Sequence, residues 1–99
     1  MISRQWRGTS KSADADRYVS HLREETFPQL RAIRGFVDAS ILRRRVPEGV
    51  EFRIVTTWES TEAIRRFAGE NPERAVVPEK VREMMVAYDS TVDHYELIE

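Results

Sequence analysis

The stretch Trp58-Glu-Ser-Thr-Glu-Ala-Ile-Arg-Arg-Phe-Ala-Gly69 carries the clearest local signals in this chain of 99 residues. Ser60 or Thr61 can cap a helix by accepting a hydrogen bond from its first turn, and Gly69 can end that helix. Between these signals, apolar residues recur at the spacing of one buried helical face, namely Ala63, Ile64, Phe67 and Ala68. The stretch therefore predicts an amphipathic helix that follows directly on the end of a strand.

Two strands before this helix are predicted to form an antiparallel hairpin. Phe36–Val46 is the first strand and Glu51–Glu59 is the second, with Phe52, Ile54, Thr56 and Trp58 on one face of it. The short connection Pro47-Glu48-Gly49 is typical of a tight turn, because glycine tolerates a positive φ. Since the two strands are joined by so few residues, they must be neighbours.

The N-terminal third predicts a strand followed by a helix. Ile2–Thr9 alternates as a strand does, and Ala13–Thr26 carries a buried helical stripe. Pro28 disfavours helical geometry at Phe27, so we expect the first helix to end there. A second short helical turn is then expected to run as far as Gly35.

The C-terminal third predicts two more helical segments and a last strand. Asn71-Pro72 has the pattern of a helix cap followed by proline. Pro78 is expected to open a helix that ends at Asp89-Ser90. The stripe of that helix would consist of Val81, Met84, Met85 and Tyr88. Thr91–Glu99 is the final predicted strand.

The order strand, helix, hairpin, helices, strand predicts one fold. Short connections and right-handed crossovers arrange it as a split βαβ unit, the ferredoxin-like fold of the α+β class, in a single domain spanning residues 1–99. The helices would cover one face of an antiparallel sheet. The other face also carries apolar residues, and nothing in the chain remains to cover it. We therefore expect a homodimer.

Composition argues against several classes of protein. The formal net charge of −1 gives no global attraction to nucleic acid or to an anionic membrane. There is no cysteine, so thiolate chemistry and cysteine-bound metal are absent, and we expect no metal site. No apolar run approaches a membrane span, and the N-terminus has no signal-peptide pattern. The chain is therefore expected to be cytoplasmic.

Five segments resemble the antibiotic biosynthesis monooxygenase family, whose members are dimeric α/β-barrel proteins. These segments are Pro28…Gly35-Phe36, Thr57-Trp58-Glu59-Ser60, Ala63–Gly69, Ala75-Val76-Val77-Pro78 and His94-Tyr95-Glu96. The resemblance covers nearly the whole chain. It implies a dimeric barrel, and it points to fold and family more strongly than to one activity.

The resemblance leaves three functions open. The family includes quinone-forming monooxygenases that use neither metal nor flavin, haem-degrading monooxygenases, and members without an assigned role. The three positions of the haem-degrading branch fall at Trp6, Phe67 and about Val77, and none carries the needed group. The resemblance therefore favours a cofactor-independent monooxygenase that oxidises a phenolic or polycyclic aromatic with O2. A non-catalytic ligand-binding or stress-associated dimer is the alternative, and haem binding is the third.

Three residues are candidates for catalysis. An imidazole is the natural base for a phenol or enol near neutral pH, so His94 is the candidate base, although a hydrogen-bonded histidine at a dimer seam would fit equally. Arg4 and Trp6 share a face of the first strand, where a guanidinium and an indole N–H could hold an oxyanion. The alternative for this pair is an aromatic core residue beside a snorkelling arginine.

Four residues are candidates for binding a small aromatic ligand in a cleft between helices and sheet. Phe67, Tyr88 and Met84 could form its walls, or they could simply be core. Tyr95 points to the opposite face from His94 on a regular strand, so only one of the two is expected to line the cleft.

Overall fold

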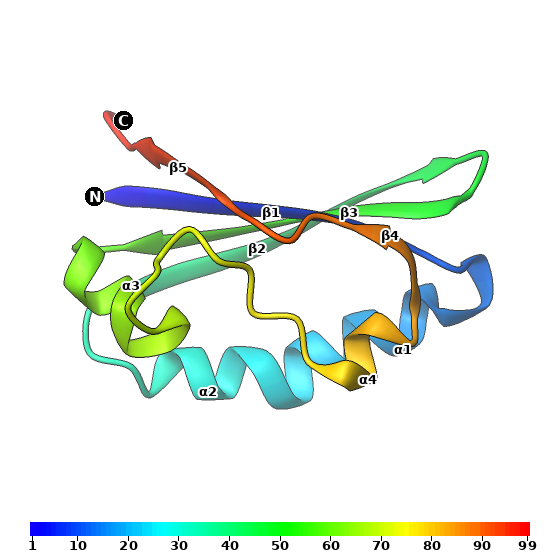
Figure 1. The fold of residues 1–99 in the computed structure, drawn as a ribbon, viewed down its shortest axis with the longest axis horizontal. Coiled ribbons are helices and arrows are strands. Elements are labelled where there is room, and N and C mark those ends of the chain that lie inside the picture. Colours follow the sequence, from blue (N-terminus) through cyan, green and yellow to red (C-terminus); the bar gives the residue numbers. More distant parts are fainter.

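The computed structural model describes residues 1–99 and contains a five-stranded antiparallel sheet with all helices on one side (Figure 1). The strands are β1 (Ile2–Ser10), β2 (Phe36–Val46), β3 (Gly49–Trp58), β4 (Met85–Tyr88) and β5 (Asp93–Glu96). The sheet order is β2-β3-β1-β4, and β5 pairs with the other end of β1. This order confirms the predicted α+β, ferredoxin-like fold, and the sheet is open rather than closed into a barrel.

The hairpin and the helix after it are confirmed. β2 and β3 pair along their whole length around the predicted turn. Helix α3 (Thr61–Ala68) begins where Ser60 Oγ accepts a hydrogen bond of 3.2 Å from the Ala63 N–H. It ends at Gly69, whose φ of 83° suits glycine better than any other residue.

The first helix continues through the point where the sequence predicted a break. The helical layer begins with the 3₁₀ turn η1 (Ser12–Asp14) and continues through α1 (Ala15–His21), the π-helical segment η2 (Leu22–Thr26) and α2 (Phe27–Arg31). The Phe27 N–H bonds the Leu22 carbonyl, five residues back. This wider turn precedes Pro28, and in an α-helix the proline ring would clash with the carbonyl four residues back. The chain therefore absorbs the proline without leaving the helix.

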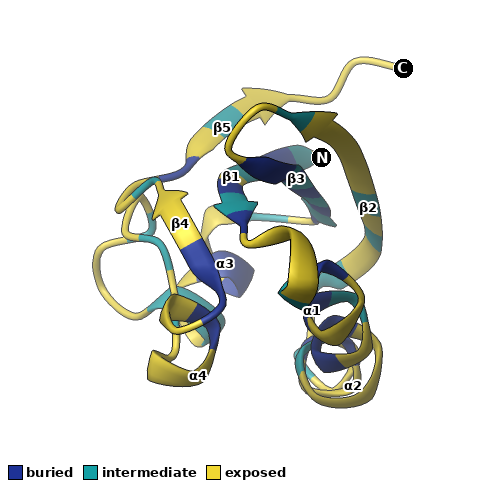
Figure 2. Cartoon of the chain, turned by 90° about the vertical axis from the view of Figure 1, so that its right-hand side faces the viewer, coloured by how far each residue is buried: buried dark blue, intermediate teal, exposed yellow.

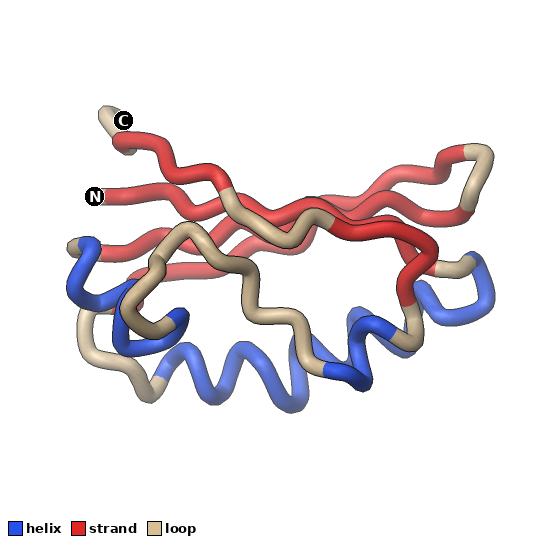
Figure 3. The backbone as a smooth tube through the Cα atoms, in the orientation of Figure 1, coloured by secondary structure: helices blue, strands red, loops and turns tan.

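The prediction of a last helix from Pro78 to Asp89 is wrong. Only α4 (Glu79–Arg82) is helical, and Met85–Tyr88 is strand β4, which pairs with Gly8–Ser10 of β1. A short apolar run fits a helix and a strand equally well, and here the open edge of β1 supplies partners for its backbone groups. Asn71-Pro72 starts no helix either. The segment from Gly69 to Pro78 is a long connection with one bridge, from Arg74 to Thr91 (Figure 3).

Buried residues lie in β3, α1 and α3, among other elements (Figure 2), and they belong to one hydrophobic core between the sheet and the helices. Trp58 is fully buried, and its ring packs against Phe36 at 5.3 Å and Phe67 at 6.0 Å between ring centres. Its indole N–H donates a 2.8 Å hydrogen bond to Thr56 Oγ1, which satisfies its one polar atom. Trp58 therefore anchors the end of β3 to α3.

The outer face of the sheet is not covered by any part of the chain. Leu42 and Tyr95 on this face are more than half exposed. Charged and polar pairs lie among them, including Arg44 with Glu51 at 2.9 Å. None of the helices is both long enough and apolar enough to cross a membrane.

Candidate functional site

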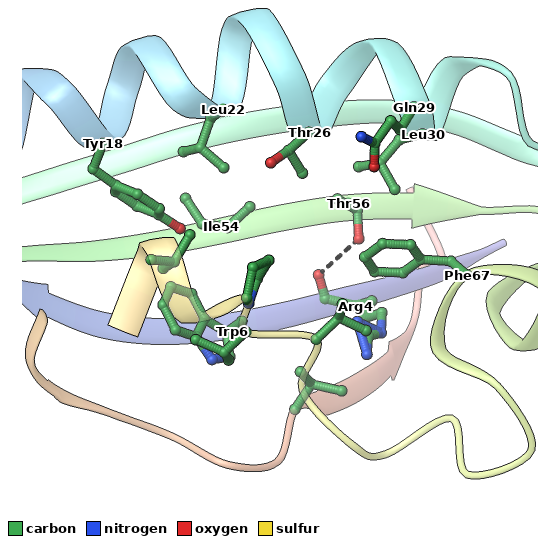
Figure 4. A pocket seen from close by; sticks show the side chains of 15 residues that line it. Arg4, Trp6, Tyr18, Leu22, Thr26, Gln29, Leu30, Ile54, Thr56 and Phe67 are labelled. Atoms are coloured by element: carbon green, nitrogen blue, oxygen red, sulfur yellow. Dashed lines mark hydrogen bonds between the residues drawn. The ribbon is translucent and has the colours of Figure 1, made fainter. Parts of the chain in front are cut away.

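A cavity of about 110 Å³ lies between the helical layer and the inner face of the sheet. Ten of its fifteen lining residues are hydrophobic, which is typical of sites for small organic ligands. β1 supplies Arg4 and Trp6, α1 supplies Tyr18, and α3 supplies Phe67 (Figure 4). The structure therefore brings together three of the residues that the sequence singled out, Arg4, Trp6 and Phe67.

Arg4 is a buried cation without a counterion. Its side chain is 5% exposed, and its single hydrogen bond runs 2.8 Å from Nη2 to the Arg74 carbonyl. No carboxylate lies within ion-pair distance, and Nε is buried without a partner. Burial lowers the pKa of Arg4 to about 10, so it remains charged at neutral pH. A buried charge of this kind is a ready site for an oxyanion.

One aromatic ring lies against the Arg4 guanidinium, and a second lies further along the cavity wall. Its central carbon lies 5.5 Å from the centre of the Phe67 ring, within cation–π range. Trp6 lies two residues further along the same face of β1, and its indole N–H donates a 2.8 Å hydrogen bond to the Asp89 carbonyl. That donor is therefore occupied, and Trp6 offers the cavity its ring. Gly8 makes room for this ring, because a methyl group there would overlap it.

His94 lies beside the cavity rather than in its wall. It pairs with Arg4 across β1 and β5, so both side chains leave the same face of the sheet. Its Nε2 is buried without a hydrogen-bond partner. Burial and then the Arg4 charge lower the pKa of His94, and Glu73 and Asp93 oppose this shift only in part. The imidazole is therefore neutral at neutral pH and able to accept a proton.

The other three candidates occupy different places. Tyr88 faces a second, outer groove of about 590 Å³, which shares Phe67 and the segment Val76–Pro78 with the cavity as walls. Met84 is buried in the core and lines neither space. Tyr95 is on the outer face of the sheet and 53% exposed. This agrees with the prediction that neighbouring residues of a strand, here His94 and Tyr95, point to opposite faces. Of the adjacent pair, His94 is the one on the cavity side.

Four polar residues of the cavity wall were missed by the sequence analysis, namely Tyr18, Thr26, Gln29 and Thr56. Tyr18 belongs to the apolar stripe of the first helix, which suggested a core residue. Thr26 is the last residue of the π-helical segment and Gln29 follows it, and the wider turn changes which side chains face the sheet. Pro28, within a helical pattern, was the one available signal that the helix is irregular here.

Comparisons with known proteins support the fold. No family model matches the chain, and no curated protein matches it. A protein from Bacillus cereus with the provisional description antibiotic biosynthesis monooxygenase is similar in structure, with a TM-score of 0.68 and 21% sequence identity. The match covers 100% of this chain and 93% of that one.

A second solved structure is similar over the same length. It is a variant of SnoaB, a cofactor-independent oxygenase from Streptomyces nogalater, with a TM-score of 0.65 and 18% identity. The match covers 99% of this chain and 93% of that one. At this identity the likeness extends to the fold, and the whole chain corresponds to nearly the whole of each similar protein. The chain therefore has the fold of the antibiotic biosynthesis monooxygenases.

Proposed function

We propose that this chain belongs to the antibiotic biosynthesis monooxygenases and oxidises a phenolic or polycyclic aromatic substrate with O2, without a cofactor. The observation that carries the proposal is Arg4, a buried guanidinium with no carboxylate partner in an aromatic-walled cavity. An electron-rich substrate must be ionised before it can pass an electron to O2. A fixed, desolvated cation stabilises that anion where it forms.

The reaction balances without an added reductant. For an anthrone, a CH2 group and O2 give a C=O group and H2O. The ionised substrate gives one electron to O2, the carbon radical and superoxide join, and the hydroperoxide loses water. All four electrons that reduce O2 come from the substrate, because the oxidation of its CH2 carbon to C=O releases four electrons. The protein needs to ionise, orient and desolvate the substrate.

The roles follow from position. Arg4 holds the oxyanion, Trp6 and Phe67 contact the ring, and His94 accepts the proton from beside Arg4. Because His94 does not line the cavity, it acts through a bridging water or after a small shift. A cavity of about 110 Å³ is comparable to the roughly 150 Å³ that holds benzene, so it accepts one ring. Further rings would extend past Val76–Pro78 into the outer groove.

A non-catalytic ligand-binding protein is the second candidate. It is favoured by one observation, namely that no histidine or carboxylate lines the cavity. Such a protein would bind the same aromatic anion through Arg4 and turn nothing over.

We also propose that two copies pair through the outer faces of their sheets. This surface is uncovered, and it carries Leu42 and Tyr95 among complementary charges. Pairing would bury these side chains and close the open sheets against each other.

Oxygen uptake by the metal-free protein with a panel of anthrones and naphthoquinols tests the function. We expect uptake well above the uncatalysed rate and a loss of at least tenfold in Arg4→Met and in His94→Ala. Arg45→Met, which removes an exposed arginine from β2, is the matched control and should keep full activity. If binding is seen by thermal shift but uptake equals the uncatalysed rate, the ligand-binding candidate replaces the oxygenase. Uptake that survives in His94→Ala would mean that another base acts.

A further inference from the structure

The Tyr18 hydroxyl is a polar group of the cavity wall to which the proposed function gives no role. Tyr18 is 3% exposed as a residue, and its hydroxyl makes no hydrogen bond to the protein. The buried side-chain atoms without a partner are Arg4 Nε and His94 Nε2, so the Tyr18 hydroxyl is open to the cavity that it lines. The ring is held firmly, packing edge-on against Phe52 at 4.9 Å and against Trp6 at 6.3 Å between centres. In Figure 4 the hydroxyl is directed into the cavity from the helical side.

Tyr18 and Arg4 lie toward opposite ends of the cavity. Phe52, which Tyr18 contacts, pairs with Gly8 of β1, while Arg4 pairs with Thr56 of β3. The order along β1 is therefore Arg4, then Trp6, then the position over which Tyr18 packs. Four residues of strand span about 13 Å. That length is on the order of one aromatic ring with a hydrogen bond at each end.

We propose that Tyr18 is a catalytic residue that donates a hydrogen bond to the oxygen added to the substrate, and that the cavity directs this addition to the ring carbon para to the oxyanion on Arg4. The inference rests on the proposed function and names its substrate class. The reacting ring is a terminal, phenolic ring with a free para position, and the fused remainder extends toward the outer groove.

The size of the cavity selects this class. Its volume of about 110 Å³ suits one ring, so a naphthol places its reacting ring inside. An anthrone reacts at its central ring and would need both outer rings accommodated. The oxidation of 1-naphthol also balances without an added reductant, since C10H8O and O2 give 1,4-naphthoquinone, C10H6O2, and H2O.

Tyr18 donates a hydrogen bond during the reaction and gives up neither its proton nor an electron. The naphtholate on Arg4 gives one electron to O2, and the new C–O bond forms at the para carbon. The terminal oxygen of this peroxide accepts a hydrogen bond from Tyr18 and takes back, through water, the proton that the naphthol hydroxyl gave to His94. The O–O bond then breaks, water leaves with the former C–H proton, and the second carbonyl forms. Burial raises the pKa of Tyr18, so the hydroxyl keeps its proton and remains a donor over the working range.

Product analysis with 1,5-dihydroxynaphthalene is the first test. We expect the wild type to give the para-quinone at least tenfold over the ortho-quinone. In Tyr18→Phe we expect kcat to fall about tenfold with KM nearly unchanged, and the para:ortho ratio to approach that of the uncatalysed reaction. The ring packing is kept in this variant, and an unchanged melting temperature checks it. Tyr95→Phe, the same change on the outer face of the sheet, should leave the ratio unaltered.

Anaerobic binding gives a second test that does not depend on turnover. The para oxygen of 4-methoxy-1-naphthol can accept from Tyr18, and 1-naphthol lacks it. We expect the wild type to bind the methoxy compound about three- to tenfold more tightly and Tyr18→Phe to bind both equally. Equal binding by the wild type, or an unchanged product ratio in Tyr18→Phe, overturns the inference.

The two proposals fail separately. Uptake with anthrones but not with naphthols removes the inference and leaves the oxygenase. Preferential binding of the methoxy compound without uptake on any substrate removes the oxygenase and leaves the placement of Tyr18 at the para end.

Discussion

A buried guanidinium without a carboxylate is uncommon, because taking a charge out of water costs free energy that an ion pair normally offsets in part. Arg4 has one backbone carbonyl and the face of Phe67 as its partners. Neither neutralises the charge. The positive charge of Arg4 therefore selects a ligand with a negative charge, and the apolar walls around it select a ligand whose remaining surface is apolar.

His94 should make stability depend on pH in a definite direction. Its pKa in the folded protein lies below the ordinary value of 6.5, so the unfolded chain takes up the proton first as the pH falls. The contribution of His94 to the free energy of unfolding should therefore be fully present above about pH 6.5. It should decline as the pH falls toward the lowered pKa. His94→Gln should lose less stability than the wild type between pH 7.5 and 5.5 in urea denaturation. Parallel curves for the two proteins would show that the histidine is not buried as described.

The candidate site was only partly predictable at the level of residues. Strand alternation alone placed Arg4 and Trp6 on one face and separated His94 from Tyr95. It could not show that the Trp6 N–H is bound to the Asp89 carbonyl, since that contact joins positions 83 residues apart. Tyr18 could not be distinguished from core, because a cavity is a property of packing and leaves no mark on helical periodicity.

At the scale of elements, α3 depends on the residue that caps its N-terminus. Ser60 Oγ accepts from the Ala63 N–H, and the helix that it caps carries Phe67 to the cavity. Ser60→Ala should lower the free energy of unfolding by about 0.5–2 kcal/mol, measured by urea denaturation. Ser20→Ala changes an exposed serine inside α1 and is the matched control, expected within about 0.5 kcal/mol of the wild type. Equal effects of the two substitutions would mean that the cap contributes nothing.

Elements with explicit start and stop signals were predictable, and elements decided by their neighbours were not. The hairpin and α3 have a turn, a cap and a glycine of their own. Met85–Tyr88 is a short apolar run without start or stop signals of its own. It forms a strand because its backbone groups can pair with the free edge of β1. Pro28 is a strong helix breaker in isolation, yet η2 adapts to it because Leu22, Phe27 and Leu30 are held in the core on both sides.

At the scale of the molecule, the uncovered sheet face predicts self-association. Tyr95→Asp should place a charge in the proposed contact and weaken the dimer at least tenfold, as judged by sedimentation velocity at micromolar concentrations. Ser20→Asp on the helical layer adds the same charge away from this face and should leave the dimer intact. A wild-type protein that sediments as a monomer would remove the dimer proposal.

The uncompensated Arg4 charge also has an evolutionary consequence. In the empty protein it lowers stability, so its replacement by methionine should be tolerated or even favoured by a screen that selects only for heat resistance. Such a screen would enrich proteins that fold better and bind no anion. The persistence of arginine at this position among proteins of this fold would then measure how strongly selection favours ligand binding over folding.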